Sequence, residues 1–192
     1  TLVVTGTSDR SNPSAPTDAA LLAMLTLTPA DILDATGNTD TLGWTFDSDG
    51  EAFDYLAVSE TLILTYTITV TDSQGGMDTT TVTITINGTN DDPVITNGDD
   101  TASLDETNAG LMTTGTLTVD DLDTTDTVDA TRTLVVTGTS DRSDPAAPDD
   151  PALLAMLTLT PADILDATEN TDTLDWTFDS DGVTFDYLAV SE

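Results

Sequence analysis

The sequence predicts an all-β protein, an antiparallel β-sandwich with short helical insertions, and three observations support this. Residues 61–72 and 79–88 alternate apolar side chains with threonine, the period-two pattern of strands that bury one face. The SQGG segment at 73–76 is a turn signal, so these strands should form a long antiparallel hairpin. Further short runs rich in Leu, Val and Thr, separated by turn residues, favour a sandwich with Greek-key-like connections.

Several shorter segments complete the predicted elements. Strands are expected in the runs MLTLT (24–28), LGWTF (42–46), GTLTV (115–119) and RTLVVTGT (132–139). A short helix is expected within 17–25. A further helical turn is expected at 29–35, because Pro29 suits a first turn and Asp31 suits the positive end of a helix.

The chain contains a long internal repeat. Residues 133–192 repeat residues 1–60 at an offset of 132, and only eight of the sixty positions differ. A period of about 132 residues has the size of a domain, which predicts tandem near-identical domains. With the joint at 90–92, residues 1–90 are the later part of one repeat and residues 91–192 the earlier part of the next. Each part is then expected to have open strand edges, completed by flanking sequence or by another copy.

The composition excludes several classes of function. The chain has 36 Asp and Glu, three Arg, and no Lys, His or Cys, for a formal charge of −33. Nucleic acid and anionic membrane surfaces are poor partners for such a chain, and no apolar run is long enough to span a bilayer. Without His and Cys, the available metal ligands are oxygens, which suit calcium or magnesium.

Acidic residues gather at predicted loops, and most of the carboxylates are expected only to keep the surface solvated. The clusters are Asn90-Asp91-Asp92, Asp105-Glu106, Asp120-Asp121 with Asp123, Asp47 with Asp49, and Glu60 before the hairpin. Closely spaced carboxylates repel one another unless they bind a cation or stay in solvent. The FDSDG segment at 46–50 begins like an EF-hand loop, but Val58 stands at its twelfth position, so an ordinary Asp-Gly turn is the alternative there.

Several motifs resemble those of a known family. The segment FDYLAVSETLILTYTITVTDSQGGMDTTTVTITINGTNDDPVI at 53–95, together with GTLTVDDLD and WTFDSDG, is similar to the VCBS repeat. This is a cadherin-like, bacterial Ig-like module of very large RTX-type adhesins. The resemblance covers the whole period, although the insert around 10–40 is less familiar. It implies a tandem extender module that is exported by a type I route and stiffened by calcium between domains.

The resemblance also implies a ligand set for calcium. Glu60, the linker residues Asn90, Asp91 and Asp92, and the pair Asp121 and Asp123 would serve one joint. Glu106 would serve the following joint and Asp72 the preceding one. The linker motif is shorter than in cadherins and lacks the Arg of their acidic triplet, so the number of ions per joint is left open.

These inferences lead to a non-catalytic structural repeat of a secreted bacterial adhesin or surface filament. Its partners would be neighbouring repeats or filament copies, with polysaccharide or a host surface bound through other regions. The alternative is a carbohydrate-binding module that uses Trp44 and Trp176, although these residues also suit a core or rim position in a sandwich. A glycosidase with paired carboxylates is disfavoured, because no apolar pocket is indicated that would raise a carboxyl pKa.

Overall fold

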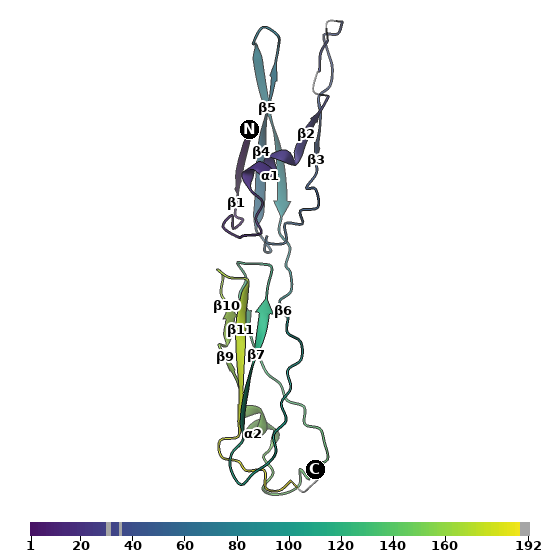
Figure 1. The fold of residues 1–192 in the computed structure, drawn as a ribbon. Helices are drawn as coiled ribbons and strands as arrows, with labels where there is room; N and C mark the ends of the chain where they lie inside the picture. Colours follow the sequence, from purple (N-terminus) through teal and green to yellow (C-terminus); the bar gives the residue numbers. More distant parts are fainter. Residues whose placement is uncertain (30–31, 35, 189–192) are drawn as a thin grey trace. The chain divides into compact units, whose positions relative to one another are not determined.

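The computed structural model describes residues 1–29, 32–34 and 36–188. The chain forms antiparallel sheets with two short helices in this described part, so the prediction of a β-rich chain with short helical insertions is confirmed (Figure 1). It divides into two compact units. Unit 1 comprises Thr1–Asp91 with Leu122–Thr124, and unit 2 comprises Asp92–Asp121 with Thr125–Glu192.

The main sheet of unit 1 contains the predicted hairpin. Strand β4 (Thr61–Thr71) pairs along its whole length with β5 (Met77–Asn87), and β1 (Leu2–Gly6) pairs with the other edge of β4. Alternate residues of β4 are buried, as the period-two pattern requires. Asp72 begins the connecting turn, and its carboxylate accepts hydrogen bonds from the backbone N–H groups of Gln74 and Gly76 at 2.8 and 2.7 Å.

The remaining elements of unit 1 cover the buried face of this sheet. Helix α1 (Asp18–Ala23) lies within the range predicted for a helix, and Thr17 caps its first turn by accepting the Ala20 N–H. Strands β2 (Leu25–Thr28) and β3 (Gly43–Phe46) form a separate hairpin, close to their predicted ranges. The core is an apolar cluster whose buried members come from α1 and its C-cap, from the 53–56 turn and from β4: Leu21, Met24, Phe53, Tyr55, Leu56, Leu62, Leu64, Tyr66 and Ile68. Leu25 and Phe46 pack against it.

Unit 2 is built on a four-stranded sheet in the order β6-β7-β11-β9. Its strands are β6 (Val94–Ile95), β7 (Met112–Asp120), β11 (Thr171–Asp179) and β9 (Leu157–Thr160). Strands β8 (Val128–Asp129) and β10 (Asp163–Leu165) form a small second sheet, and helix α2 (Asp150–Ala155) precedes β9. The core of unit 2 is a smaller cluster of Val119, Ile164, Leu165 and Leu174.

The strand predicted at 132–139 is wrong, since these residues form no strand in unit 2. The identical sequence at Leu2–Gly6 is strand β1, and it owes that structure to its pairing with β4. Unit 2 contains no counterpart of β4 among its described residues, so the backbone of 133–138 has no ladder to join. The sequence favours a strand at both places, but only one of them has a partner.

The helical turn predicted at 29–35 is also wrong where the repeat can be compared. In the second copy the same residues include β10, which pairs with β8 and buries Ile164 and Leu165. In the first copy, residues 30, 31 and 35 lie outside the described residues, and 32–34 adopt no regular structure. Unit 1 contains no equivalent of β8 in its described part, and Leu33 there is 57% exposed.

Within the described part of the chain, no helix is long and apolar enough to cross a membrane.

Candidate functional site

The acidic residues expected to bind calcium fall in different places. Unit 1 contains Glu60, Asn90, Asp91, Asp123 and Asp72, whereas unit 2 contains Asp92, Asp121 and Glu106. Glu60 lies just before β4 and Asp72 just after it. The eleven residues of strand β4 separate these two positions by roughly 40 Å. Within unit 1, only the Glu60 end of the hairpin approaches the 90–91 linker.

Backbone hydrogen bonds position Glu60 and the linker at one end of unit 1. The carbonyl oxygen of Glu60 accepts the Gly88 N–H at 3.0 Å, and its carboxylate accepts the Ala57 N–H at 3.1 Å. Gly88 lies so close to the 56–57 turn that an added Cβ would collide with the carbonyl oxygens of Leu56 and Ala57. The chain can therefore pass from β5 into the linker along this path only with glycine at position 88.

Asp123 ties the linker to unit 1. Its side chain is completely buried, and one carboxylate oxygen accepts the backbone N–H of Asp91 at 2.8 Å. Asn90 donates from its side-chain amide to the carbonyl oxygen of Asp91 at 3.0 Å. The neighbouring Thr124 accepts a hydrogen bond from the buried Asn12 side chain. The 122–124 segment is thus held by polar contacts to two separate parts of unit 1.

Unit 2 contributes carboxylates with different exposure. Asp121 is 5% exposed, and its backbone N–H donates to the carbonyl oxygen of Asn170 at 2.9 Å. The Oδ1 atom of Asp120 is buried and accepts no hydrogen bond from the described residues. Asp92 and Glu106 are exposed. In the part of the chain that the structure describes, no group of three or more acidic side chains is arranged so that it could hold a metal ion.

Other acidic motifs serve as turns. In FDSDG, the Asp47 carboxylate accepts the Asp49 N–H at 2.9 Å, and Asp49 has a positive φ of 54°. The second copy repeats this geometry, with Asp179 accepting the Asp181 N–H at 2.9 Å. Both copies therefore form the ordinary Asp-Gly turn. Asp9 also accepts hydrogen bonds within its own loop. The hydroxyl and the backbone N–H of Ser11 donate to its carboxylate and hold the pKa of Asp9 below its usual range.

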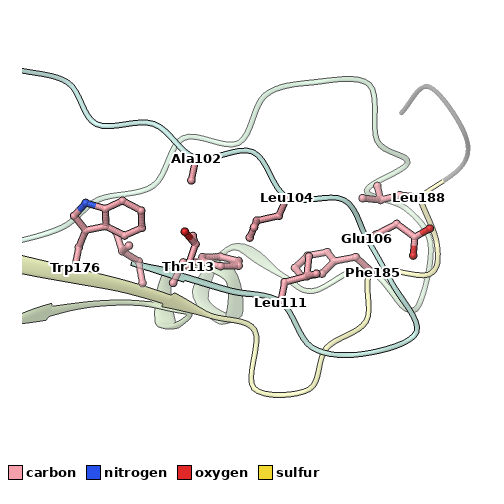
Figure 2. Close-up of a pocket in the computed structure, with 10 residues that line it drawn as sticks. Ala102, Leu104, Glu106, Leu111, Thr113, Trp176, Phe185 and Leu188 are labelled. Atoms are coloured by element: carbon pink, nitrogen blue, oxygen red, sulfur yellow. The ribbon is translucent and has the colours of Figure 1, made fainter. Parts of the chain in front are cut away.

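An apolar cavity in unit 2 is a feature that the sequence did not indicate. Its volume is about 430 Å³, and most of its lining side chains are apolar: Ala102, Leu104, Glu106, Leu111, Thr113, Leu157, Trp176, Phe178, Phe185 and Leu188. Figure 2 shows Trp176 at one end of the cavity, and Phe185, Leu188 and Glu106 at the other. The signal in the sequence was the alternation of Leu174, Trp176 and Phe178, which predicts an apolar strand face but not whether anything covers it.

Trp176 is held in place by Asp100 and by Gly115 of the neighbouring strand β7. Its indole N–H donates to the Asp100 carboxylate at 2.8 Å. It pairs across the sheet with Gly115, and a Cβ at Gly115 would lie 2.5 Å from two atoms of the indole. Trp44, its counterpart in unit 1, is 50% exposed. The tryptophan at this position of the repeat is thus half exposed in unit 1 and fixed beside a cavity in unit 2.

Comparison with known proteins gives no match to a family model, to a curated protein or to a solved structure.

Proposed function

We propose that the chain is part of a non-catalytic structural extender repeat of a large secreted bacterial adhesin or surface filament, stiffened by calcium at the joints between repeats. The observation that carries this proposal is the repeat itself. Fifty-two of sixty residues recur at an offset of 132, counted as sixty aligned positions less eight differences. A spacer is lengthened by copying one domain, and near-identical tandem copies are what such lengthening produces.

The proposed complete repeat is a β-sandwich assembled from elements that the two units show separately. Unit 1 contributes the β1-β4-β5 sheet, and unit 2 contributes the β6-β7-β11-β9 sheet. In unit 1, Leu25 of β2 and Phe46 of β3 pack against the cluster that includes Leu62 and Leu64 of β4. Their counterparts Leu157 and Phe178 lie on β9 and β11. In one domain, these contacts would bring the two sheets face to face.

Calcium is proposed at the joint because its carboxylates are withdrawn from water. Asp123 and Asp121 have 0% and 5% exposure in a chain of net charge −33. Taking a carboxylate out of water is costly, and a bound divalent cation is a common way to offset that cost in extracellular modules. The N–H of Asp91 bound to Asp123 connects the linker to one of these carboxylates. An ion that also took oxygens from Glu60, Asn90 or Asp92 would limit the freedom of the linker.

A melting experiment tests the calcium proposal. The chain is melted in millimolar calcium, in millimolar magnesium and in chelator, and is compared with the double variant Asp121→Asn, Asp123→Asn. Calcium at about a hundred times its dissociation constant should stabilise the parent by roughly 2.7 kcal/mol. The double variant should gain little. Equal gains in both proteins, or none in the parent, would rule out calcium at this joint.

A carbohydrate-binding module is a second candidate, and the exposed indole of Trp44 favours it. An indole with half its surface in solvent is available to stack on a sugar ring. Glycan-array binding that is lost in Trp44→Ala and kept in Trp44→Phe would support this candidate. Binding that is absent in the parent chain would leave the extender as the sole proposal.

A further inference from the structure

Several residues that line the cavity of unit 2 have counterparts in unit 1 at the same position of the repeat. Five of its lining side chains repeat residues of the first copy at an offset of 132, and one of them, Trp176, corresponds to the half-exposed Trp44. The other four have counterparts in the core of unit 1: Leu157 corresponds to Leu25, Phe178 to Phe46, Phe185 to Phe53 and Leu188 to Leu56. All four residues of the first copy belong to, or pack against, the cluster that contains Leu62, Leu64, Tyr66 and Ile68 of β4. These side chains therefore belong to, or pack against, the core cluster that includes β4 in one unit, and they line a cavity in the other.

A second observation concerns the segment that pairs with β4. In unit 1, Leu2–Gly6 pairs with residues 62–66. In unit 2 the identical residues Leu134, Val135 and Val136 are 39%, 85% and 38% exposed. Three consecutive exposed apolar residues with strong strand propensity make a segment that favours pairing with a strand.

A pair of glycines gives a third observation. Gly6 has a φ of +117°, and an added Cβ would collide with the backbone of Thr61, the first residue of β4. Gly138 has nearly the same φ, +116°, and faces no atom within 4 Å. The backbone of Gly138 thus already has the conformation that accommodates β4 in unit 1, while the corresponding space is open.

We propose that unit 2 provides a docking surface, made of the cavity and the 134–138 segment, for an antiparallel β-hairpin of the Thr61–Asn87 type, with Leu, Tyr and Ile on one face and Thr on the other. The first strand of the hairpin would pair with 134–138, and its apolar face would fill the cavity beside Phe178 and Leu157. The segment 61–87 contains only two charged residues, Asp72 and Asp78, so it adds little repulsion against an acidic body. The inference rests on the proposed function in taking both units as portions of one repeating domain, but it does not require calcium.

The test uses the full chain extended after Glu192 by a copy of residues 61–90. This restores the order found in the first copy, where Thr61 directly follows Glu60. The matched control carries the same extension with its counterparts of Leu62, Leu64, Tyr66 and Ile68 changed to Thr. Both proteins carry Trp44→Phe, so that Trp176 alone reports on unit 2. All samples contain chelator, so that a failure of docking is separate from a failure of the calcium proposal.

The expected result is a strand at 134–138. Amide hydrogens in this segment should exchange at least about tenfold more slowly in the extended chain than in the parent or the control. Binding of the dye anilinonaphthalene sulfonate, which reports apolar cavities, should fall in the extended chain alone. Unchanged exchange at 134–138, or equal slowing in both extended proteins, would overturn the proposal. Dye that stayed bound to the extended chain would also overturn it and would make the cavity a small-molecule site.

If the extended chain is insoluble, the synthetic peptide 61–87 is added to the Trp44→Phe chain instead. The expected result is a saturable blue shift of Trp176 emission that the Thr-substituted peptide does not produce. Absence of a shift at millimolar peptide would count against docking.

Discussion

The clearest test of how context determines this fold is a pair of identical leucines. Leu165 in β10 is 1% exposed and belongs to the core cluster of unit 2, whereas its repeat counterpart Leu33 is 57% exposed in unit 1. Leu165→Ala removes a fully packed side chain and leaves a cavity between β10 and the four-stranded sheet. Such a truncation costs about 3 kcal/mol or more. Leu33→Ala removes a largely solvated side chain and should change stability by less than about 0.5 kcal/mol.

The two tryptophans allow each unit to be followed separately. Trp176 reports on unit 2 in a Trp44→Phe parent, and Trp44 reports on unit 1 in a Trp176→Phe parent. For a unit of about a hundred residues, a loss of about 3 kcal/mol lowers the melting temperature by roughly 12–24 °C. Leu165→Ala should show this shift, and Leu33→Ala should melt within about 2–4 °C of its parent. A loss of equal size in both variants would refute the claim that β8 creates the burial of Leu165.

Three further predictions concern individual contacts. Tyr66→Phe removes the 2.6 Å hydrogen bond from the Tyr66 hydroxyl to the Leu21 carbonyl and should destabilise unit 1 by about 1 kcal/mol in urea titrations. Burial raises the pKa of Tyr66. The neutral Tyr66 side chain therefore contributes fully to the stability of unit 1 below pH 10, and this contribution is lost as the pH rises through the raised pKa. The Phe variant should not show this loss of stability at alkaline pH. Gly6→Ala should destabilise unit 1 by about 3 kcal/mol or more, because it combines a strained φ with a backbone collision. Gly138→Ala meets only the strained φ and should destabilise unit 2 by about 1 kcal/mol. Equal losses of stability in the two variants would contradict this. Gly115→Ala should displace Trp176 and break its hydrogen bond to Asp100, and a red shift of Trp176 emission in the Trp44→Phe parent would report it.

The parts of the fold that the sequence predicted depend on local pattern. The β4–β5 hairpin follows from strict alternation and a turn signal, and alternate residues of β4 are buried from Leu62 to Ile68. Contacts between residues close in the chain recur in both copies. Arg10 pairs with Asp18 and Arg142 with Asp150, eight residues apart in each case, and both FDSDG segments form the same turn.

The parts that could not be predicted depend on partners far away in the chain. TLVVTGT is a strand beside β4 and irregular elsewhere, although its propensity is the same at both places. PADIL carries helix-start signals at Pro161 and Asp163, yet its second copy becomes a strand because β8 offers a partner and a site to bury Ile164. The burial of Asp123 could not be predicted from local pattern either, since it depends on Asp91, whose N–H its carboxylate accepts from 32 residues earlier in the chain.

The central claim, that the acidic joint binds calcium, is tested most directly by an anomalous difference map from crystals grown in millimolar calcium. The account predicts a peak within about 2.3–2.6 Å of the carboxylate oxygens of Asp121 and Asp123, with further oxygens from the 90–92 linker or Glu60. A map in which these carboxylates are well resolved and no anomalous peak lies beside them would contradict it.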